Sequence, residues 1–261
     1  MKGRPIVGLA LGSGAAKGYA HIGVIRVLEK YGIPIDLVTG SSIGSIIGAL
    51  YASGMSVDYM ESMAYHIKRR HWLDITFPRL GLIAGNKVEE MLRLLTRNRN
   101  FDELKIPLGV VATDLRSKRS VLIREGNVAS AVRASIAIPG IFRPVIKAGM
   151  VLVDGGVLER VPGRAARVMG ADIVIGVELG FSGKSSLDNI YDILIQTFEV
   201  MGRELQALKS YDCDILITPN LEGVNPMAFG EPERCIQEGI RATEAAVPKI
   251  LSILEGKGYD R

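Results

Sequence analysis

Hydrophobic residues along the chain fall into short continuous runs, separated by longer stretches in which apolar positions recur with helical spacing. The runs are apolar at successive positions rather than alternating with polar residues, which is typical of strands buried on both faces. We expect strands at Ile6–Leu11, Leu37–Thr39, Leu108–Ala112, Val151–Val153, Ile173–Val177 and Ile215–Thr218. Buried strands that alternate with helices predict an α/β fold with a mostly parallel central sheet, covered by helices on both faces.

Helical spacing predicts eight helices between and after these strands. They are expected at Ala20–Tyr31, Ile43–Ala52, Val57–Arg70, Lys87–Thr96, Ala129–Ser135, Ala165–Met169, Ile190–Leu208 and Glu233–Leu254. Asn86 with Glu89 three residues later predicts a capping box at the start of the fourth helix. Pro232 stands where a helix tolerates proline in its first turn.

Two segments stand out from this pattern. Ile190–Leu208 carries one apolar stripe, which we expect to be a buried helix face rather than a partner-binding surface. The members of the stripe are Ile190, Leu194, Thr197, Met201, Leu205 and Leu208. His71–Gly85 is the least regular part of the sequence and is the best candidate for a mobile flap.

Length and composition are those of a globular protein in one domain. The 261 residues are 48% hydrophobic and 23% charged, with no repeat, low-complexity tract or linker that would divide them. We therefore expect residues 1–261 to form a single domain. Cys213 and Cys235 form neither a disulfide framework nor a metal-ligand pattern, which favours a reducing cytoplasm.

The charge balance restricts the partners of the protein. Lysine and arginine number 32 against 28 acidic residues, and aromatic residues make up 6% of the chain. Without a long basic block or an aromatic platform, nucleic acid is excluded as a partner. A weakly basic surface would suit transient contact with anionic lipid. No apolar stretch approaches the ~20 residues of a membrane span, so we expect a cytoplasmic protein that is at most peripheral to the membrane.

The strongest chemical signal is Gly40-Ser41-Ser42-Ile43-Gly44, between a predicted strand and a predicted helix. A Gly-x-Ser-x-Gly sequence in this position is a nucleophile elbow, in which a sharp turn exposes the serine hydroxyl. The helix N-terminus beneath the turn favours developing negative charge. Ser42 is therefore the candidate nucleophile.

A second signal is the glycine-rich loop Gly12–Gly18, which also joins a strand to a helix. Backbone N–H groups can converge on an anion in such a loop. A dinucleotide site needs an acidic residue at the end of the second strand, but Asp36 precedes that strand. A phosphate loop needs Gly-Lys followed by Ser or Thr, whereas this chain has Lys17-Gly18-Tyr19. The third use is an oxyanion hole, with donors from Gly14, Ala15, Ala16 and Lys17.

The base that would activate Ser42 cannot come late in the chain as a histidine. The three histidines are His21, His66 and His71, so the order serine, aspartate, histidine is excluded. His66 and His71 belong to a charged, solvated stretch, and His21 is placed to orient the glycine loop. A carboxylate is therefore the predicted base.

Asp154 is the best candidate for that carboxylate. It ends the apolar strand Val151–Val153 and precedes Gly155 and Gly156, which allow a tight turn and a close backbone approach. An ordinary aspartate, with a pKa of ~3.9, is a weak base for a serine hydroxyl. Burial in a closed site would raise its basicity.

Together these loops resemble those of the patatin-like phospholipases, in particular the compact bacterial members. Gly12–Gly18 resembles the oxyanion motif of that family, Gly40–Gly44 its nucleophile elbow and Asp154–Gly156 its aspartate motif. The segments Ala134–Pro144 and Ala112–Leu115 are also similar to shared blocks. The resemblance covers about residues 5 to 180.

The resemblance implies a three-layer α/β/α fold and hydrolysis of acyl esters of lipids or lysophospholipids. It also implies a Ser42–Asp154 dyad without histidine, and neither a metal nor another cofactor. The glycines that support these motifs are Gly12, Gly18, Gly40, Gly44, Gly155 and Gly156. Acyl-chain length, head group and oligomeric state are not specified by the motifs.

Some positions depart from the family pattern. Ser13 and Ala15 stand where many members have glycine, Lys17 replaces the more frequent arginine, and Glu159 occupies a place where asparagine is common. Lys17 could pair with a substrate phosphate, although a solvent-exposed side chain is the simpler expectation. The alternative function is a non-catalytic adaptor or regulatory protein that retains the fold.

Overall fold

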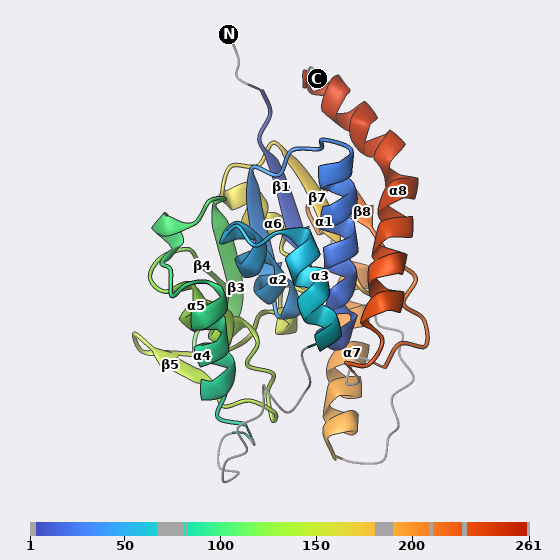
Figure 1. The fold of residues 1–261 in the computed structure, drawn as a ribbon. Helices are drawn as coiled ribbons and strands as arrows, with labels where there is room; N and C mark the ends of the chain where they lie inside the picture. Colours follow the sequence, from blue (N-terminus) through green and yellow to red (C-terminus); the bar gives the residue numbers. More distant parts are fainter. Residues whose placement is uncertain are drawn as a thin grey trace.

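The computed structural model describes residues 4–66, 81, 83–180, 190–208, 211–225 and 229–259. Within this part of the chain, eight strands form one mixed sheet (Figure 1). Five of them are parallel neighbours in the order β3-β2-β1-β7-β8. Their bounds are β1 Val7–Leu11, β2 Leu37–Ser41, β3 Leu108–Asp114, β7 Ile173–Val177 and β8 Ile215–Ile217. The predicted α/β fold with a mostly parallel sheet is confirmed.

The remaining strands are antiparallel and gather around β3. They are β4 Arg119–Ile123, β5 Val145–Lys147 and β6 Met150–Asp154. β2 and β4 both pair with Val110 and Val111 of β3. Two strands that pair with the same residues must lie on opposite sides of β3. β6 pairs with Ala112–Asp114 of β3. Because β4 pairs with the same residues from the other side, β6 lies on the same side of β3 as β2. The ends of β2 and β6 thus meet head to head.

Helices cover both faces of the sheet, as predicted (Figure 1). The α-helices are α1 Ala20–Lys30, α2 Ile43–Ala52, α3 Val57–His66, α4 Asn86–Leu95, α5 Val128–Ser135, α6 Gly163–Val168, α7 Ile190–Leu208 and α8 Pro232–Gly256. Short 3-10 helices lie at Ala15–Tyr19 (η1), Phe101–Glu103 (η3) and Gly155–Val157 (η4). α7 lies below the sheet in Figure 1, beyond the carboxyl ends of its parallel strands, and contacts η4.

Residues of β1 divide between two hydrophobic cores. Leu9 and Leu11 join the larger core with α1, α2 and α8, whereas Ala10 joins the smaller core under α6. A β-carbon at Gly8 would lie 2.9 Å from that of Ala171, on the α6 side. Side chains alternate across a strand, so large residues face one layer and small residues let α6 approach closely on the other.

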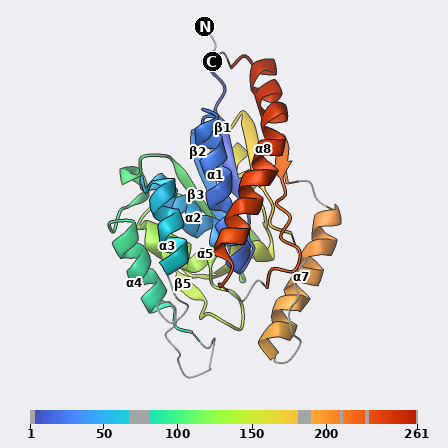
Figure 2. The same ribbon diagram turned by 45° about the vertical axis from the view of Figure 1, so that its right-hand side comes forward.

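α1 and α8 pack side by side through reciprocal glycines (Figure 2). A β-carbon at Gly23 of α1 would lie 2.1 Å from the carbonyl oxygen of Ile236, and one at Gly239 of α8 would lie 2.1 Å from that of Ala20. Each helix therefore approaches the backbone of the other at a position where only glycine fits.

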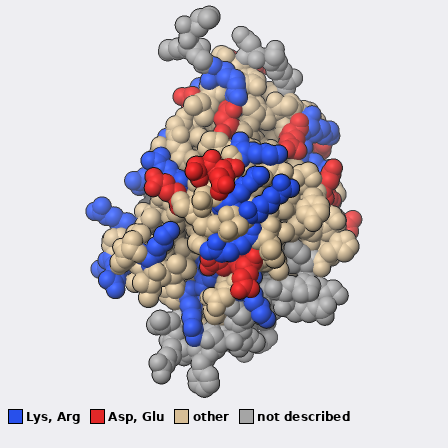
Figure 3. Space-filling view, turned by 60° about the vertical axis from the view of Figure 1, so that its left-hand side comes forward, with Lys and Arg blue, Asp and Glu red and all other residues tan. Residues whose placement is uncertain are grey.

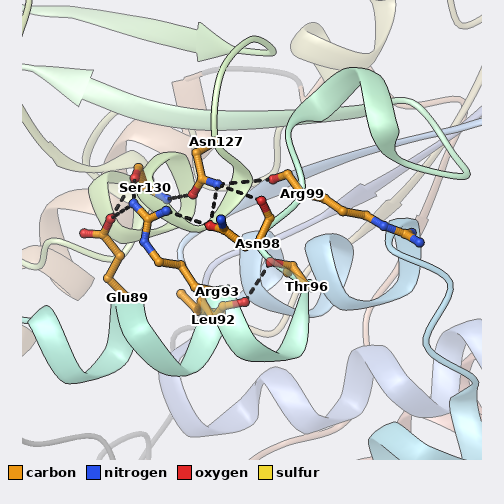
Figure 4. A network of polar contacts seen from close by, with 8 residues as sticks. All are labelled: Glu89, Leu92, Arg93, Thr96, Asn98, Arg99, Asn127 and Ser130. Carbon is orange, nitrogen blue, oxygen red and sulfur yellow. Dashed lines mark hydrogen bonds and ion pairs between the residues drawn. The ribbon is translucent and has the colours of Figure 1, made fainter.

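A polar network fixes α4 against the start of α5 (Figure 4). The guanidinium of Arg93 donates to Glu89 at 2.7 Å and to the hydroxyl of Ser130 at 2.8 Å, and that hydroxyl donates to Glu89. The side chain of Asn127 caps α5 by accepting from the N–H of Ser130, and it donates to Asn98. The network sets the position of α4, which forms one wall of the cavity described below.

Several local predictions are wrong. Gly85, with φ +83°, is the N-cap of α4, so the predicted Asn86–Glu89 capping box does not form there and Glu89 binds Arg93 and Ser130 instead. In the stripe predicted on α7, Met201 is 55% exposed and Thr197 is exposed, which contradicts a buried face at these two positions, whereas the side chains of Ile190, Leu205 and Leu208 lie outside the described residues. The predicted first-turn position of Pro232 in α8 is confirmed.

Other predictions fall partly outside the described residues. This applies to residues 67–70, with which the predicted helix Val57–Arg70 ends, and to His71 and most of the irregular segment to which it belongs. Within that segment, Ile83 is described and forms a bridge with Phe142.

Candidate active site

Ser42 lies at a sharp turn between β2 and α2. Its φ of +53° and ψ of −124° are rare for serine, and it is the N-cap of α2. A β-carbon at Gly40 would lie 2.5 Å from the Cα of Ser45, and one at Gly44 would lie 2.1 Å from the carbonyl oxygen of Leu11. The two glycines of the motif are therefore required by close backbone packing, as in a nucleophile elbow.

The side chain of Ser42 meets that of Asp154. Its Oγ donates to Oδ2 of Asp154 at 2.6 Å, and Oδ1 accepts from the N–H of Gly156 at 2.8 Å. The strand registers explain the meeting, because Ser41 pairs with Val111 and Asp154 pairs with the next residue of β3. A serine and an aspartate 112 residues apart are thus brought together by β3.

The environment of Asp154 raises its basicity. Burial raises the pKa of its carboxyl to about 6, against the opposing effects of the hydrogen bonds from Ser42 and Gly156 and of the charge of Arg160. A carboxylate with this pKa is ionised at neutral pH and is a stronger base than an ordinary aspartate. The arrangement can accept a proton from the hydroxyl of Ser42.

Two further serines hold the turn, and sequence reasoning gave neither of them a role. The hydroxyl of Ser135 accepts from the N–H of Ser42 at 2.9 Å and donates to the carbonyl of Val111 at 2.6 Å. The hydroxyl of Ser45 donates to the carbonyl of Ser42 at 2.6 Å. Ser135 begins no recognisable motif of its own, but it lies in the segment that resembles a shared block of the family.

The adjacent Ser41 is held in the interior by a different contact. It is fully buried, and its hydroxyl accepts a hydrogen bond from the hydroxyl of Ser13 at 3.1 Å. Ser41 is the last residue of β2, whereas the hydroxyl of Ser42, in the turn that follows, reaches Asp154.

The glycine loop packs directly against the elbow. A β-carbon at Gly18 would lie 2.0 Å from the side chain of Ile43, and one at Gly12 would lie 2.5 Å from the carbonyl oxygen of Val177. Ala15 has φ +49°, a left-handed conformation that favours glycine, which is the residue many family members carry there. The loop therefore keeps glycine-like geometry despite the alanine.

The loop also shows which N–H groups are available. The N–H of Lys17 donates to the carbonyl of Gly14 at 3.1 Å, which removes it from the predicted set of oxyanion donors. No group of the described residues accepts from the N–H of Gly14, Ala15 or Ala16. The N–H of Ile43, in the first turn of α2, is a further donor that the sequence analysis did not consider.

Lys17 itself differs from expectation. Its side chain is only 1% exposed rather than solvated, because η1 packs against α8. Burial lowers the pKa of Lys17, and the charge of Glu199 on α7 opposes that effect. The side chain is thus part of the interior next to the loop.

Neither of the two histidines within the described residues, His21 and His66, contacts Ser42. His21 is fully buried and its Nε2 donates to the carbonyl of Gly12 at 2.8 Å, which agrees with a role in orienting the loop. Burial lowers the pKa of His21 to about 4, so its ring is neutral at pH 7. His66 is exposed and bonds to the carbonyl of Ser62.

Ser42 lies at the wall of an apolar cavity of about 190 Å³. Ile43, Ile46, Ile47 and Leu50 form one face of α2 along it. They recur at helical spacing, so the cavity follows α2 for about 12 Å from Ser42. The rest of the lining is also mostly apolar and includes Met60, Met63, Val88, Ile136, Ile141 and Phe142.

Arg133 fixes the outer wall of this cavity. Its guanidinium donates to the carbonyls of Ala84 and Arg143, at 2.6 and 2.8 Å, and lies 5.2 Å from the ring centroid of Phe142. The two segments that it joins also carry the cavity residues Ile83 and Phe142.

Glu159, the other departure from the family pattern, does not face the cavity. Its carboxylate accepts from the hydroxyl of Ser120 at 2.7 Å and from the N–H of Ala165 at 3.3 Å.

Among the described residues, no three histidine, cysteine or acidic side chains are grouped so that they could hold a metal ion. None of the helices in the described ranges is long and apolar enough to cross a membrane.

Asp36 also has a structural role. Its carboxylate accepts from the N–H of Val7 at 2.8 Å and pairs with Arg4, so it fixes the start of β1 rather than facing the glycine loop.

This chain spans only part of the length of the curated relatives that it matches. An uncharacterized NTE family protein of Mycobacterium bovis is 38% identical over 181 residues, which are 68% of this chain and 50% of that protein. Patatin-like phospholipase domain-containing protein 6 of Homo sapiens is 33% identical over 201 residues, which are 72% of this chain and 14% of that protein.

Solved structures share the fold at low sequence identity. VipD from Legionella pneumophila matches 95% of this chain with a TM-score of 0.71 and 14% identity, over 67% of its own chain. The type III effector protein ExoU matches 99% of this chain with a TM-score of 0.55 and 14% identity, over 54% of its own chain. The family model of the patatin-like phospholipases matches residues 9–167, which contain Ser42, Asp154 and the glycine loop. The chain therefore belongs to the patatin-like phospholipase family.

Proposed function

We propose that this protein is a serine hydrolase that cleaves acyl esters of lipids through a dyad of Ser42 and Asp154. The observation that carries the proposal is the hydrogen bond from the hydroxyl of Ser42 to the buried carboxylate of Asp154, beside an apolar cavity. A base, a nucleophile and a site for an acyl chain thus occur together. Family membership supports the same class of reaction.

The reaction begins with acylation of the serine. As Ser42 Oγ attacks the ester carbonyl, its proton passes to Asp154 Oδ2, and a tetrahedral oxyanion forms. N–H groups of Gly14, Ala15 and Ile43 are the proposed donors to that oxyanion. When the intermediate collapses, the bond to the alcohol breaks and Asp154 returns the proton to the leaving oxygen.

Deacylation repeats these steps with water. Asp154 takes a proton as water attacks the acyl-serine carbonyl, and the proton returns to Ser42 Oγ as the fatty acid leaves. The neutral ring of His21 takes no part in proton transfer, and its bond to Gly12 holds the loop.

The apolar cavity accounts for a preference for acyl groups. Each methylene removed from water contributes about 0.8 kcal/mol, which is roughly a fourfold gain in kcat/KM when the cavity holds it in the transition state. Among the described residues, only Ser42 and Tyr19 bring hydroxyl groups to the lining, so the cavity suits a hydrocarbon chain rather than a sugar or a nucleotide.

Hydrolysis of chromogenic fatty-acyl esters tests the proposal. Asp154→Asn keeps the shape of the side chain but cannot accept the proton, so kcat should fall by at least about 100-fold. Ser42→Ala should abolish the activity, whereas Ser41→Ala, the matched control, should keep most of it. An Asp154→Asn protein with near wild-type kcat would contradict the dyad, and a wild-type protein inactive on every ester would favour a regulatory protein with the same fold.

A further inference from the structure

A second, larger cavity lies on the other side of the turn that follows Asp154. Its volume is about 710 Å³, and its wall begins at Gly156 and continues through the turn into α6, with β4 opposite. Within the part of the chain that the structure describes, it shares no lining residue with the apolar cavity beside Ser42. The hydrolytic reaction proposed above gives it no role.

The lining of this cavity is cationic. Four basic side chains border it, namely Lys118, Arg119, Arg160 and Arg164, against two acidic ones, Glu159 and Asp212. Figure 3 looks onto the side of the molecule that carries β4, where basic side chains gather near the middle of the face. A cavity of several hundred Å³ lined by charged donors has the dimensions of a small-molecule site.

The acidic side chains do not neutralise this lining. Glu159 and Asp212 keep their charges, but four basic side chains against two acidic ones leave the lining with a positive balance of two, and the oxygens of Glu159 already accept hydrogen bonds from Ser120 and Ala165. Lys118, Arg119 and Arg164 are exposed and form no ion pair with any residue of the described ranges. Three cations therefore line the same cavity without an ion-pair partner among the described residues, although Glu159 and Asp212 also border it.

The strand edge alone does not explain these charges. Basic residues on an outer strand prevent pairing with other chains, and that would account for Lys118 and Arg119 beside β4. Arg164 belongs to α6, which is far from them in sequence and has no strand edge to protect. Cations from two separate elements thus converge on one cavity, as they do in sites that bind anions.

We propose that this cavity binds a small polyanion that carries phosphate groups. Guanidinium groups bind phosphate oxygens in pairs through a planar array of donors, and a lysine adds a mobile point charge. The volume exceeds what a single phosphate fills, so a ligand with two or more phosphates fits best. Such phosphates can belong to a soluble compound or to the head groups of an anionic lipid.

Calorimetric titration with tripolyphosphate at about 0.15 M salt tests the site, since screening at that ionic strength suppresses weak long-range attraction. The variant K118Q/R119Q/R164Q should bind at least about tenfold more weakly than the wild type, because each charge-assisted hydrogen bond contributes to affinity. The matched control is R97Q/R124Q/K249Q, which removes the same charge from exposed positions elsewhere. It should bind within about twofold of the wild type.

A second arm identifies the source of the phosphate. Flotation with vesicles of phosphatidylglycerol and phosphatidylcholine is compared with vesicles of phosphatidylcholine alone. The site is supported if the K118Q/R119Q/R164Q variant loses binding in either experiment and the control variant does not. If that variant loses tripolyphosphate binding, the ligand is a soluble compound. If it loses only vesicle binding, the ligand is a lipid head group. The proposal is overturned if the wild type binds neither, or if both triple variants lose binding equally. Circular dichroism spectra and unchanged melting temperatures establish that the variants are folded.

Discussion

At the scale of single residues, the candidate site is built from side chains that are costly to bury. Asp154 and His21 are both buried, at 6% and 0% exposure, and burial shifts their pKa values in opposite directions, to about 6 and about 4. The carboxylate thereby becomes a better base, and the imidazole becomes a neutral donor to the glycine loop. Each shift links the site to the stability of the whole chain.

The two shifts oppose each other as the pH changes. Between pH 4 and pH 6 the folded chain keeps a proton on Asp154 that the unfolded chain releases, so through Asp154 a rising pH lowers the free energy of unfolding. In the same window the unfolded chain protonates His21 and the folded chain does not, so through His21 a rising pH raises that free energy. In the wild type the two contributions largely cancel.

Removing one group should therefore expose the effect of the other. Relative to the wild type, Asp154→Asn should gain about 2–3 kcal/mol in free energy of unfolding as the pH rises from 4 to 6, and His21→Gln should lose a similar amount. Urea unfolding at several pH values measures both differences. If both variants ran parallel to the wild type over this range, the burial of these two groups would be wrong.

The accuracy of sequence reasoning at this scale followed the strength of the local pattern. Ser42 and Asp154 were predicted as partners because each ends an apolar run beside glycines. The burial of Lys17 and the supporting hydroxyls of Ser135 and Ser45 were not predicted, because they depend on contacts between segments distant in the chain.

At the scale of elements, the predicted bounds were most accurate where a segment is largely apolar and buried. β7 and α2 have the predicted bounds, Ile173–Val177 and Ile43–Ala52, since each is buried along its length. β4 and β5 were not predicted, because they are outer strands in which no residue is fully buried and their apolar runs are short, Val121–Ile123 and Val145–Ile146. The stripe on α7 was recognised as amphipathic, but periodicity alone does not tell which side a helix buries.

The contact between α1 and α8 yields a prediction of this kind. Gly239→Ala places a methyl group 2.1 Å from the carbonyl oxygen of Ala20, so the helices must separate, and the free energy of unfolding should fall by about 1–3 kcal/mol. Gly256→Ala in the same helix is the control, because a β-carbon there meets no atom within 4 Å. It should be neutral or stabilise the protein by up to about 1 kcal/mol. Equal effects of the two substitutions in urea unfolding would contradict the close helix contact.

At the scale of the whole molecule, the sheet joins two distinct hollows at one turn. The apolar cavity follows α2 from Ser42, and the cationic cavity begins at Gly156, two residues after Asp154. The mostly parallel order of the strands was predicted, but the reversal around β3 that brings Asp154 to Ser42 was not, since neither β4 nor β5 was recognised. Cavities depend on how elements distant in the chain pack together, so no sequence pattern predicted either of them.

The length of the apolar cavity should set the preference for acyl chains. In a series of straight-chain esters, kcat/KM should rise by roughly fourfold per methylene until the chain reaches Leu50, and then level off. Leu50→Trp fills the end of the cavity, so the plateau should move to shorter chains while activity on acetyl esters stays close to that of the wild type. An unchanged chain-length profile in this variant would show that the acyl group lies elsewhere.

The central claim is that Ser42 is the nucleophile of an ester hydrolase, and covalent labelling tests it most directly. A fluorophosphonate reacts with an activated serine hydroxyl, and mass spectrometry of the digested protein locates the adduct. We predict a single adduct on Ser42 in the wild type and a far slower reaction in Asp154→Asn, whose side chain cannot take the proton. An adduct on Ser41 or on another serine, or no adduct on the folded wild-type protein, would contradict the account.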